Sequence, residues 1–105
     1  MIALQFDDSF IIALKANNAV ARTRFYETYS SLLYGEIKSV FPQVEIANDI
    51  LISSFTQIWK NLNDYDSKKE KLFTWALKIT RKQIRFRKIN AVINQLFSCQ
   101  QPSAN

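Results

Sequence analysis

Apolar residues recur at intervals of three and four along most of the chain, which is the spacing of one face of an α-helix. The spacing predicts four helices. They run from the Asp7-Asp8-Ser9 cap to Asn17-Asn18, from Asn18 to Phe41-Pro42, from about Glu45 to Leu62, and from Lys69 or Glu70 to about Phe97. We therefore expect an all-α fold, a single compact bundle of about four helices spanning residues 1–98, with a disordered tail over 99–105.

The predicted helices differ in how regular their apolar faces are. The second is apolar along one face except at Glu36. The third carries an inward stripe of Ile46, Ile50, Leu51, Ser54, Phe55, Ile58 and Leu62, with Trp59 beside it. The fourth carries Leu72, Trp75, Ala76, Ile79 and Phe86 on one face. Residues 61–67 are rich in Asn, Asp and Ser, which is typical of a loop.

The amino-acid composition excludes several classes of fold and of functional site. The 105 residues include one Gly, two Pro, one Cys and no His. These counts argue against an all-β fold, a disulfide framework, a cysteine-rich zinc site and a glycine-rich phosphate loop. The pairs Asp7/Asp8 and Asp64/Asp66 are explained by cap and turn chemistry. We expect a binding protein that is not an enzyme and needs no cofactor or metal.

The N-terminal residues carry no basic leader, and no apolar run is long enough to cross a membrane. With one unpaired cysteine, Cys99, these features predict a cytoplasmic protein.

Charge is distributed unevenly along the chain. Residues 1–67 contain five basic and eight acidic side chains, a net charge of −3, whereas residues 68–105 contain nine basic side chains and one Glu, a net charge of +8. All nine lie between Lys68 and Lys88. So sharp an asymmetry predicts an element that meets nucleic acid or another polyanion.

The basic residues of the predicted fourth helix run beside its apolar face. Lysine and arginine neutralise phosphates, and aromatic rings stack on unpaired bases. Two simpler interpretations stay open. Trp75 and Phe86 share a face with Leu72 and Ile79, which is also typical of core residues, and a basic stripe is often only a solvated surface.

Four blocks in order resemble the second conserved region of bacterial sigma factors, particularly the extracytoplasmic-function group. They are Asp8–Ala21, Ala21–Tyr34, Ala47–Trp59, and Tyr65-Asp66 followed by Leu72–Ile79. The resemblance covers about Asp8 to Lys88. It implies an all-α domain that binds the clamp coiled coil of core RNA polymerase and partly single-stranded promoter DNA at the −10 element. An anti-sigma protein is a further partner that the resemblance allows.

The resemblance also implies roles for particular residues. The third helix would dock on polymerase through Asp49, Ile52, Ser53 and Thr56, supported from the core by Phe55 and Trp59. Residues 63–71 would form the loop that captures a flipped base. DNA contacts would come from Asn63, Tyr65, Lys68, Lys69, Lys71, Lys78, Arg81, Lys82, Arg85 and Lys88.

Three departures from the family pattern keep an alternative open. Ile52 and Ser53 stand where the family usually has Gln and Glu, and Lys82 and Phe86 stand where it has Asn and Asp. The residues after Lys88 are too few for the family's −35-reading domain. The alternative is a degenerate sigma-like regulatory module that binds DNA or a protein partner without opening a promoter. Independently of this choice, the apolar residues of the segment Asn90 to Phe97 could pack on their own bundle or make a dimer.

Overall fold

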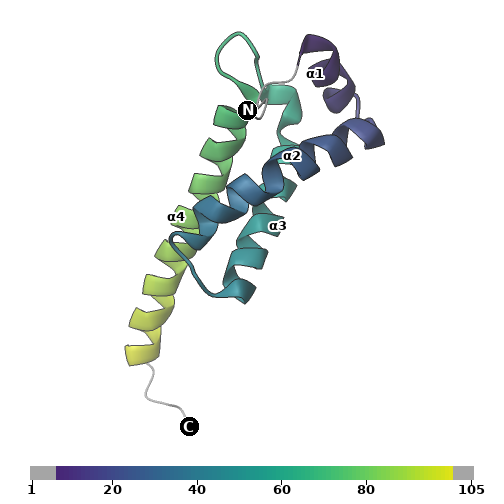
Figure 1. The fold of residues 1–105 in the computed structure, drawn as a ribbon. Helices are drawn as coiled ribbons and strands as arrows, with labels where there is room; N and C mark the ends of the chain where they lie inside the picture. Colours follow the sequence, from purple (N-terminus) through teal and green to yellow (C-terminus); the bar gives the residue numbers. More distant parts are fainter. Residues whose placement is uncertain (1–6, 101–105) are drawn as a thin grey trace.

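The computed structural model describes residues 7–100, with side chains described through residue 97. Its helices are α1 (Asp8–Lys15), α2 (Ala19–Lys38), α3 (Val44–Lys60), the short 3₁₀ helix η1 (Leu62–Asp64) and α4 (Leu72–Gln100) (Figure 1). The described residues contain no strand, and the predicted all-α bundle is confirmed. α4 continues past the expected domain end at residue 98. Residues 101–105, the rest of the expected tail, lie outside the described part.

Side-chain caps begin the first two helices. An Asp7 Oδ1 accepts from Phe10 N at 2.9 Å, and Asn18 Oδ1 accepts from Ala21 N at 2.9 Å. Between these helices Asn17 adopts a left-handed backbone with φ 69°, which asparagine tolerates better than most residues. The α1–α2 turn therefore forms where the sequence predicts it.

The fourth helix begins at Leu72, two to three residues after the predicted start near Lys69 or Glu70. Asp66 explains the difference. Its carbonyl accepts from Lys69 N at 3.0 Å and Glu70 N at 3.4 Å, and its side chain accepts from Lys68 N at 2.9 Å. These bonds fold residues 66–70 into a turn that precedes the helix.

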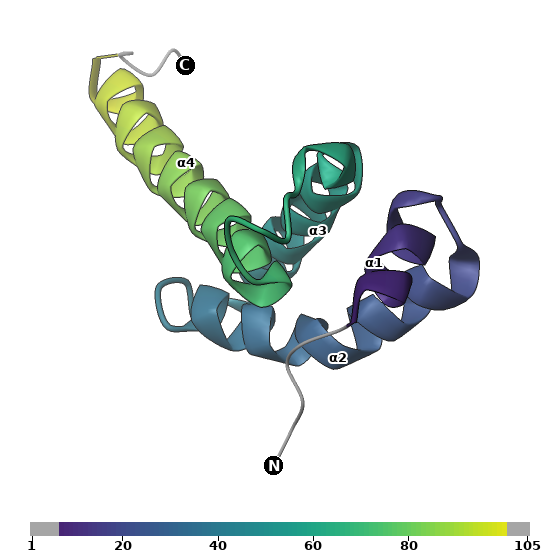
Figure 2. The same ribbon diagram turned by 90° about the horizontal axis from the view of Figure 1, so that it is seen from above.

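The core forms where α3 and α4 pack against α2, while α1 lies against the N-terminal half of α2 (Figure 2). Its centre is aromatic. The Phe25 ring lies 4.9 Å from Tyr29, 6.0 Å from Phe55 and 5.4 Å from Trp59, measured between ring centroids. Phe25 and Tyr29 are fully buried, and the Tyr29 ring also lies 5.0 Å from Phe73 of α4, so burial of apolar surface at this cluster holds the three longer helices together.

The buried face of α4 differs from the predicted one at its C-terminal end. Leu72 and Ala76 are buried as expected, but the face continues through Thr80 and Ile84, whereas Phe86 is 48% exposed. Thr80 is accommodated because its hydroxyl donates to the Ala76 carbonyl at 3.1 Å. The prediction left out Ile84 and also Thr80, a polar residue whose hydroxyl forms a hydrogen bond within its own helix. Within the described part of the chain, no helix is long and apolar enough to span a membrane.

Candidate nucleic-acid interface and docking face

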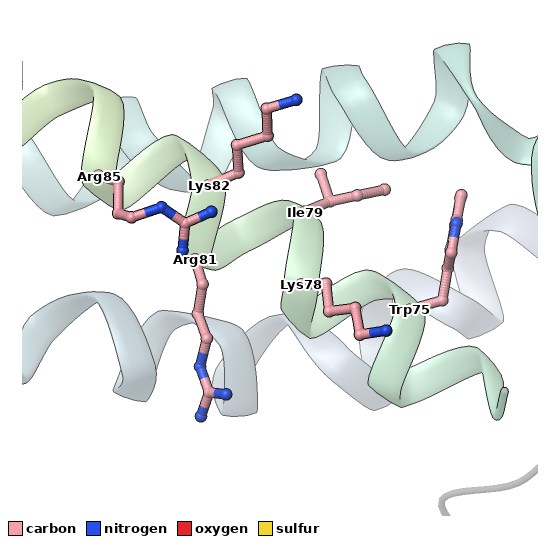
Figure 3. Close-up of a pocket in the computed structure, with 6 residues that line it drawn as sticks. All are labelled: Trp75, Lys78, Ile79, Arg81, Lys82 and Arg85. Carbon is pink, nitrogen blue, oxygen red and sulfur yellow. The ribbon is translucent and has the colours of Figure 1, made fainter.

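Six side chains from successive turns of α4 line a surface cleft of about 500 Å³. They are Trp75, Lys78, Ile79, Arg81, Lys82 and Arg85. Figure 3 shows Arg81 extending toward α2 and Lys82 toward α3. The helical repeat brings these residues together because positions three and four apart lie on neighbouring parts of one surface. Four cations around one aromatic and one aliphatic side chain form a surface suited to phosphates and an unpaired base.

The turn before α4 is anchored to the rest of the bundle. The Tyr65 hydroxyl donates to the Glu70 carbonyl at 2.8 Å, and Lys15 Nζ donates to the Tyr65 carbonyl at 2.5 Å. The Tyr65 and Trp75 rings lie 5.3 Å apart. These contacts fix the chain direction entering α4 and place the Trp75 ring at one end of the cleft.

Tyr65 itself is only 3% exposed. Burial, followed by the charges of Glu70 and Asp66, raises the pKa of its hydroxyl. The expected contact between its side chain and DNA does not fit this placement, because the ring packs into the core and orders the turn. The other expected DNA contacts of this region, Asn63, Lys68, Lys69 and Lys71, are all exposed.

Two of the four cleft cations are paired with carboxylates. Lys78 Nζ lies 2.7 Å from Glu70 Oε1, and Arg81 Nε lies 2.7 Å from Glu36 Oε2. Both pairs are partly exposed to water, so each contributes little to stability. Among the described residues, Lys82 and Arg85 have no carboxylate partner, as is true of the exposed Lys88 further along.

A second hollow of about 360 Å³ continues from the cleft toward α3. It is lined by Gln57, Asn61, Ile79, Lys82, Gln83 and Phe86, and it shares Ile79 and Lys82 with the first. Sequence reasoning missed its amide side chains because they come from two helices. It also missed Glu36 as a partner of Arg81. The sequence did mark Glu36 as unusual, because it is the one polar residue on the otherwise apolar face of α2.

The residues expected to bind polymerase lie together on the exposed side of α3. Asp49, Ile52, Ser53 and Thr56 are all exposed, and their spacing keeps them on one face. Ile52 lies at the centre of this face and is 66% exposed. The Asp49 Oδ2 lies 3.6 Å from Arg87 Nη2, a link from this docking face to α4 that spacing within one helix does not reveal.

The opposite side of α3 is fixed by packing. Phe55 is buried, and its ring centroid lies 5.5 Å from that of Trp59. The Arg22 guanidinium lies 4.9 Å from the Trp59 ring centroid, within cation–π range. Phe55 and Trp59 thus support the helix from the core side, as expected.

Among the described residues, no group of His, Cys, Asp or Glu side chains is arranged to hold a metal ion.

Residues 25–91 match the family model described as sigma-70 region 2. The match covers well over half of the chain and includes both the α4 cleft and the docking face. No curated protein and no solved structure matches the chain.

Proposed function

Because the chain belongs to the sigma-70 region 2 family, we propose that it acts in transcription initiation by binding core RNA polymerase through α3 and unpaired −10 promoter DNA through α4. The observation that carries the proposal is the α4 cleft. It combines four cations with the Trp75 ring on one surface, which is the combination that holds a single strand by its phosphates and stacks one of its bases.

The α3 face and the α4 face carry different chemical groups and therefore suit different partners. The α3 face carries one carboxylate, two hydroxyls and an exposed isoleucine, so it suits a protein surface with a complementary cation. The α4 face is basic and suits DNA. Phosphate contacts there give affinity and salt dependence, whereas sequence choice depends on contacts to the bases.

DNA binding is tested with fluorescently labelled oligonucleotides of equal length, one single-stranded and one duplex, added to the complex of the chain with core polymerase. We expect the single strand to bind more tightly because Trp75 stacks only on an unpaired base. Equal affinity for both forms would contradict the assignment of the cleft.

Polymerase binding is tested with Asp49→Ala. The substitution removes the only carboxylate among the four predicted docking residues, so affinity for the isolated clamp coiled coil should fall. The matched control is Glu27→Ala, which removes the same charge from an exposed position on α2. If both variants bind as the native chain does, Asp49 has no role in docking.

A second candidate function is a regulatory module that keeps the fold without opening promoters. The exposed Ile52 favours it, because an apolar side chain at the centre of the docking face suits a different partner helix. Fluorescence of 2-aminopurine placed in the −10 element distinguishes the two. An increase on adding the chain and polymerase supports promoter opening, and polymerase binding without an increase supports the regulatory module.

A further inference from the structure

The surface of α4 changes from basic to apolar along its length. Residues 89–97 contain no charged side chain. Six large apolar side chains in the C-terminal half of the helix are 41–59% exposed: Phe86, Ile89, Val92, Ile93, Leu96 and Phe97. Figure 1 shows this half of α4 continuing past the neighbouring ends of α2 and α3. Phe86 borders α3 through the hollow that it shares with Gln57 and Asn61, and the five apolar side chains beyond it are exposed.

These six side chains form one continuous apolar stripe. Phe86, Ile89, Ile93 and Leu96 follow one another at intervals of three, four and three, and Val92 and Phe97 flank this row. With 3.6 residues per turn, such a series stays on one side of a helix. The three-four alternation is also the spacing with which two helices pack along a shared seam.

The apolar stripe faces away from the chain's own bundle. The buried residues of α4 follow every fourth position through Leu72, Ala76, Thr80 and Ile84. Because a helix has 3.6 residues per turn, every fourth position drifts around the axis, and the side that carries Thr80 and Ile84 continues through Lys88, Ala91 and Gln95, which are outside the stripe. From Ile89 onward the stripe therefore lies on the side of α4 away from the buried face, whereas Phe86 at its start borders the hollow between α3 and α4.

The size of the stripe is sufficient for a specific contact. If a large side chain exposes about 200 Å² in full, six side chains at the observed exposures present on the order of 600 Å². That is at the upper end for the largest patch on a monomer and close to the roughly 800 Å² that each partner contributes to a standard interface. Leaving it in water opposes folding of this half of the helix.

We infer that the apolar stripe is a self-association surface and that a second copy of this chain covers it through α4–α4 packing. The seam spacing is self-complementary, so the row on one copy matches the row on the other. Residues 89–97 carry no charge, so pairing of this part of the stripe brings no like charges into contact. Apart from Phe86, which lines the hollow that continues from the cleft, this surface lies beyond the cleft residues, and its pairing does not depend on the function proposed above.

Sedimentation equilibrium of the nuclease-treated full chain, with reductant present, tests the inference from micromolar to millimolar concentration. We expect a monomer–dimer equilibrium. The comparison is Ile93→Gln, in the stripe, with Ala91→Gln as the matched control on another side of the same helical turn. Because each dimer contains two copies of the substitution, Ile93→Gln should weaken association about tenfold or more, equivalent to at least 1.4 kcal/mol, while Ala91→Gln leaves it nearly unchanged.

The salt dependence separates this dimer from one bridged by nucleic acid. Each copy carries a net charge of +5, so added salt screens repulsion and should strengthen an apolar dimer, whereas it would weaken one held by a polyanion. Helix content measured by circular dichroism, with Leu96→Gln as a second stripe variant, checks that the variants remain folded. A chain that stays monomeric at all concentrations, or a dimer that Ile93→Gln and Leu96→Gln leave intact, would overturn the inference.

Discussion

Removing the two unpaired cations of the cleft is the sharpest perturbation of the proposed DNA surface. Lys82 and Arg85 lie on adjacent turns of α4 and have no carboxylate partner among the described residues. Both are exposed, so Lys82→Gln with Arg85→Gln should leave the fold intact. The loss would fall on contacts with phosphates.

The magnitude follows from counterion release. For a single strand, the slope of log K against log salt is about −0.7 per phosphate neutralised, so four cleft cations give about −2.8 and the double variant about −1.4. A fourfold rise in salt would then weaken native binding about fifty-fold and the variant about sevenfold.

The assay is fluorescence anisotropy of a labelled single strand, titrated at several salt concentrations. The matched control is Arg24→Gln with Lys38→Gln, which removes the same charge from α2 outside the cleft. An unchanged slope for the cleft variant, or an equal change for the control, would refute the cleft as the phosphate-binding surface.

Three further predictions concern individual residues. Gly35 lies inside α2, and a Cβ added there would meet no atom within 4 Å. Gly35→Ala should therefore raise the free energy of unfolding, measured by urea titration, by about 0.5–1 kcal/mol. A loss of stability would contradict the finding that the position has room for a Cβ. Burial and then the Tyr65 charge raise the pKa of Tyr29 to about 12. Since the unfolded pKa is about 10, the native state favours the neutral hydroxyl, and stability should decline as pH rises from about 10 to about 12. Tyr29→Phe should flatten that decline, and an equally steep decline in the variant would assign it to other groups. Trp75→Ala should weaken single-strand binding by about 1–3 kcal/mol while Trp75→Phe retains most of it; equal losses in anisotropy titrations would exclude stacking as the role of the ring.

Local chemistry explains the parts of the fold that could be predicted from the sequence. Asp7 and Asn18 begin helices because their side chains accept hydrogen bonds from backbone amides three residues later, within the same segment. Phe25 and Tyr29 are four residues apart, which places both on the buried face of α2. The four predicted docking residues of α3 share a face for the same reason.

The remaining features depend on which helices meet. Tyr65 is buried because the turn before α4 folds back against Lys15, a residue fifty positions earlier. The pairs of Glu36 with Arg81 and of Asp49 with Arg87 join different helices. No periodicity within one segment encodes these contacts. Sequence reasoning therefore placed the helix faces, except at the C-terminal end of the buried face of α4, but not the partners across them.

The most direct test of the central claim is the affinity of the chain for core RNA polymerase, compared with that of Ile52→Gln combined with Ser53→Glu. The account predicts that the native chain binds and that the two substitutions change its affinity only modestly, because the exposed α3 face already presents Asp49 and Thr56. Binding by the double variant alone would contradict the account, since the fold would then be intact while the docking face had lost its partner.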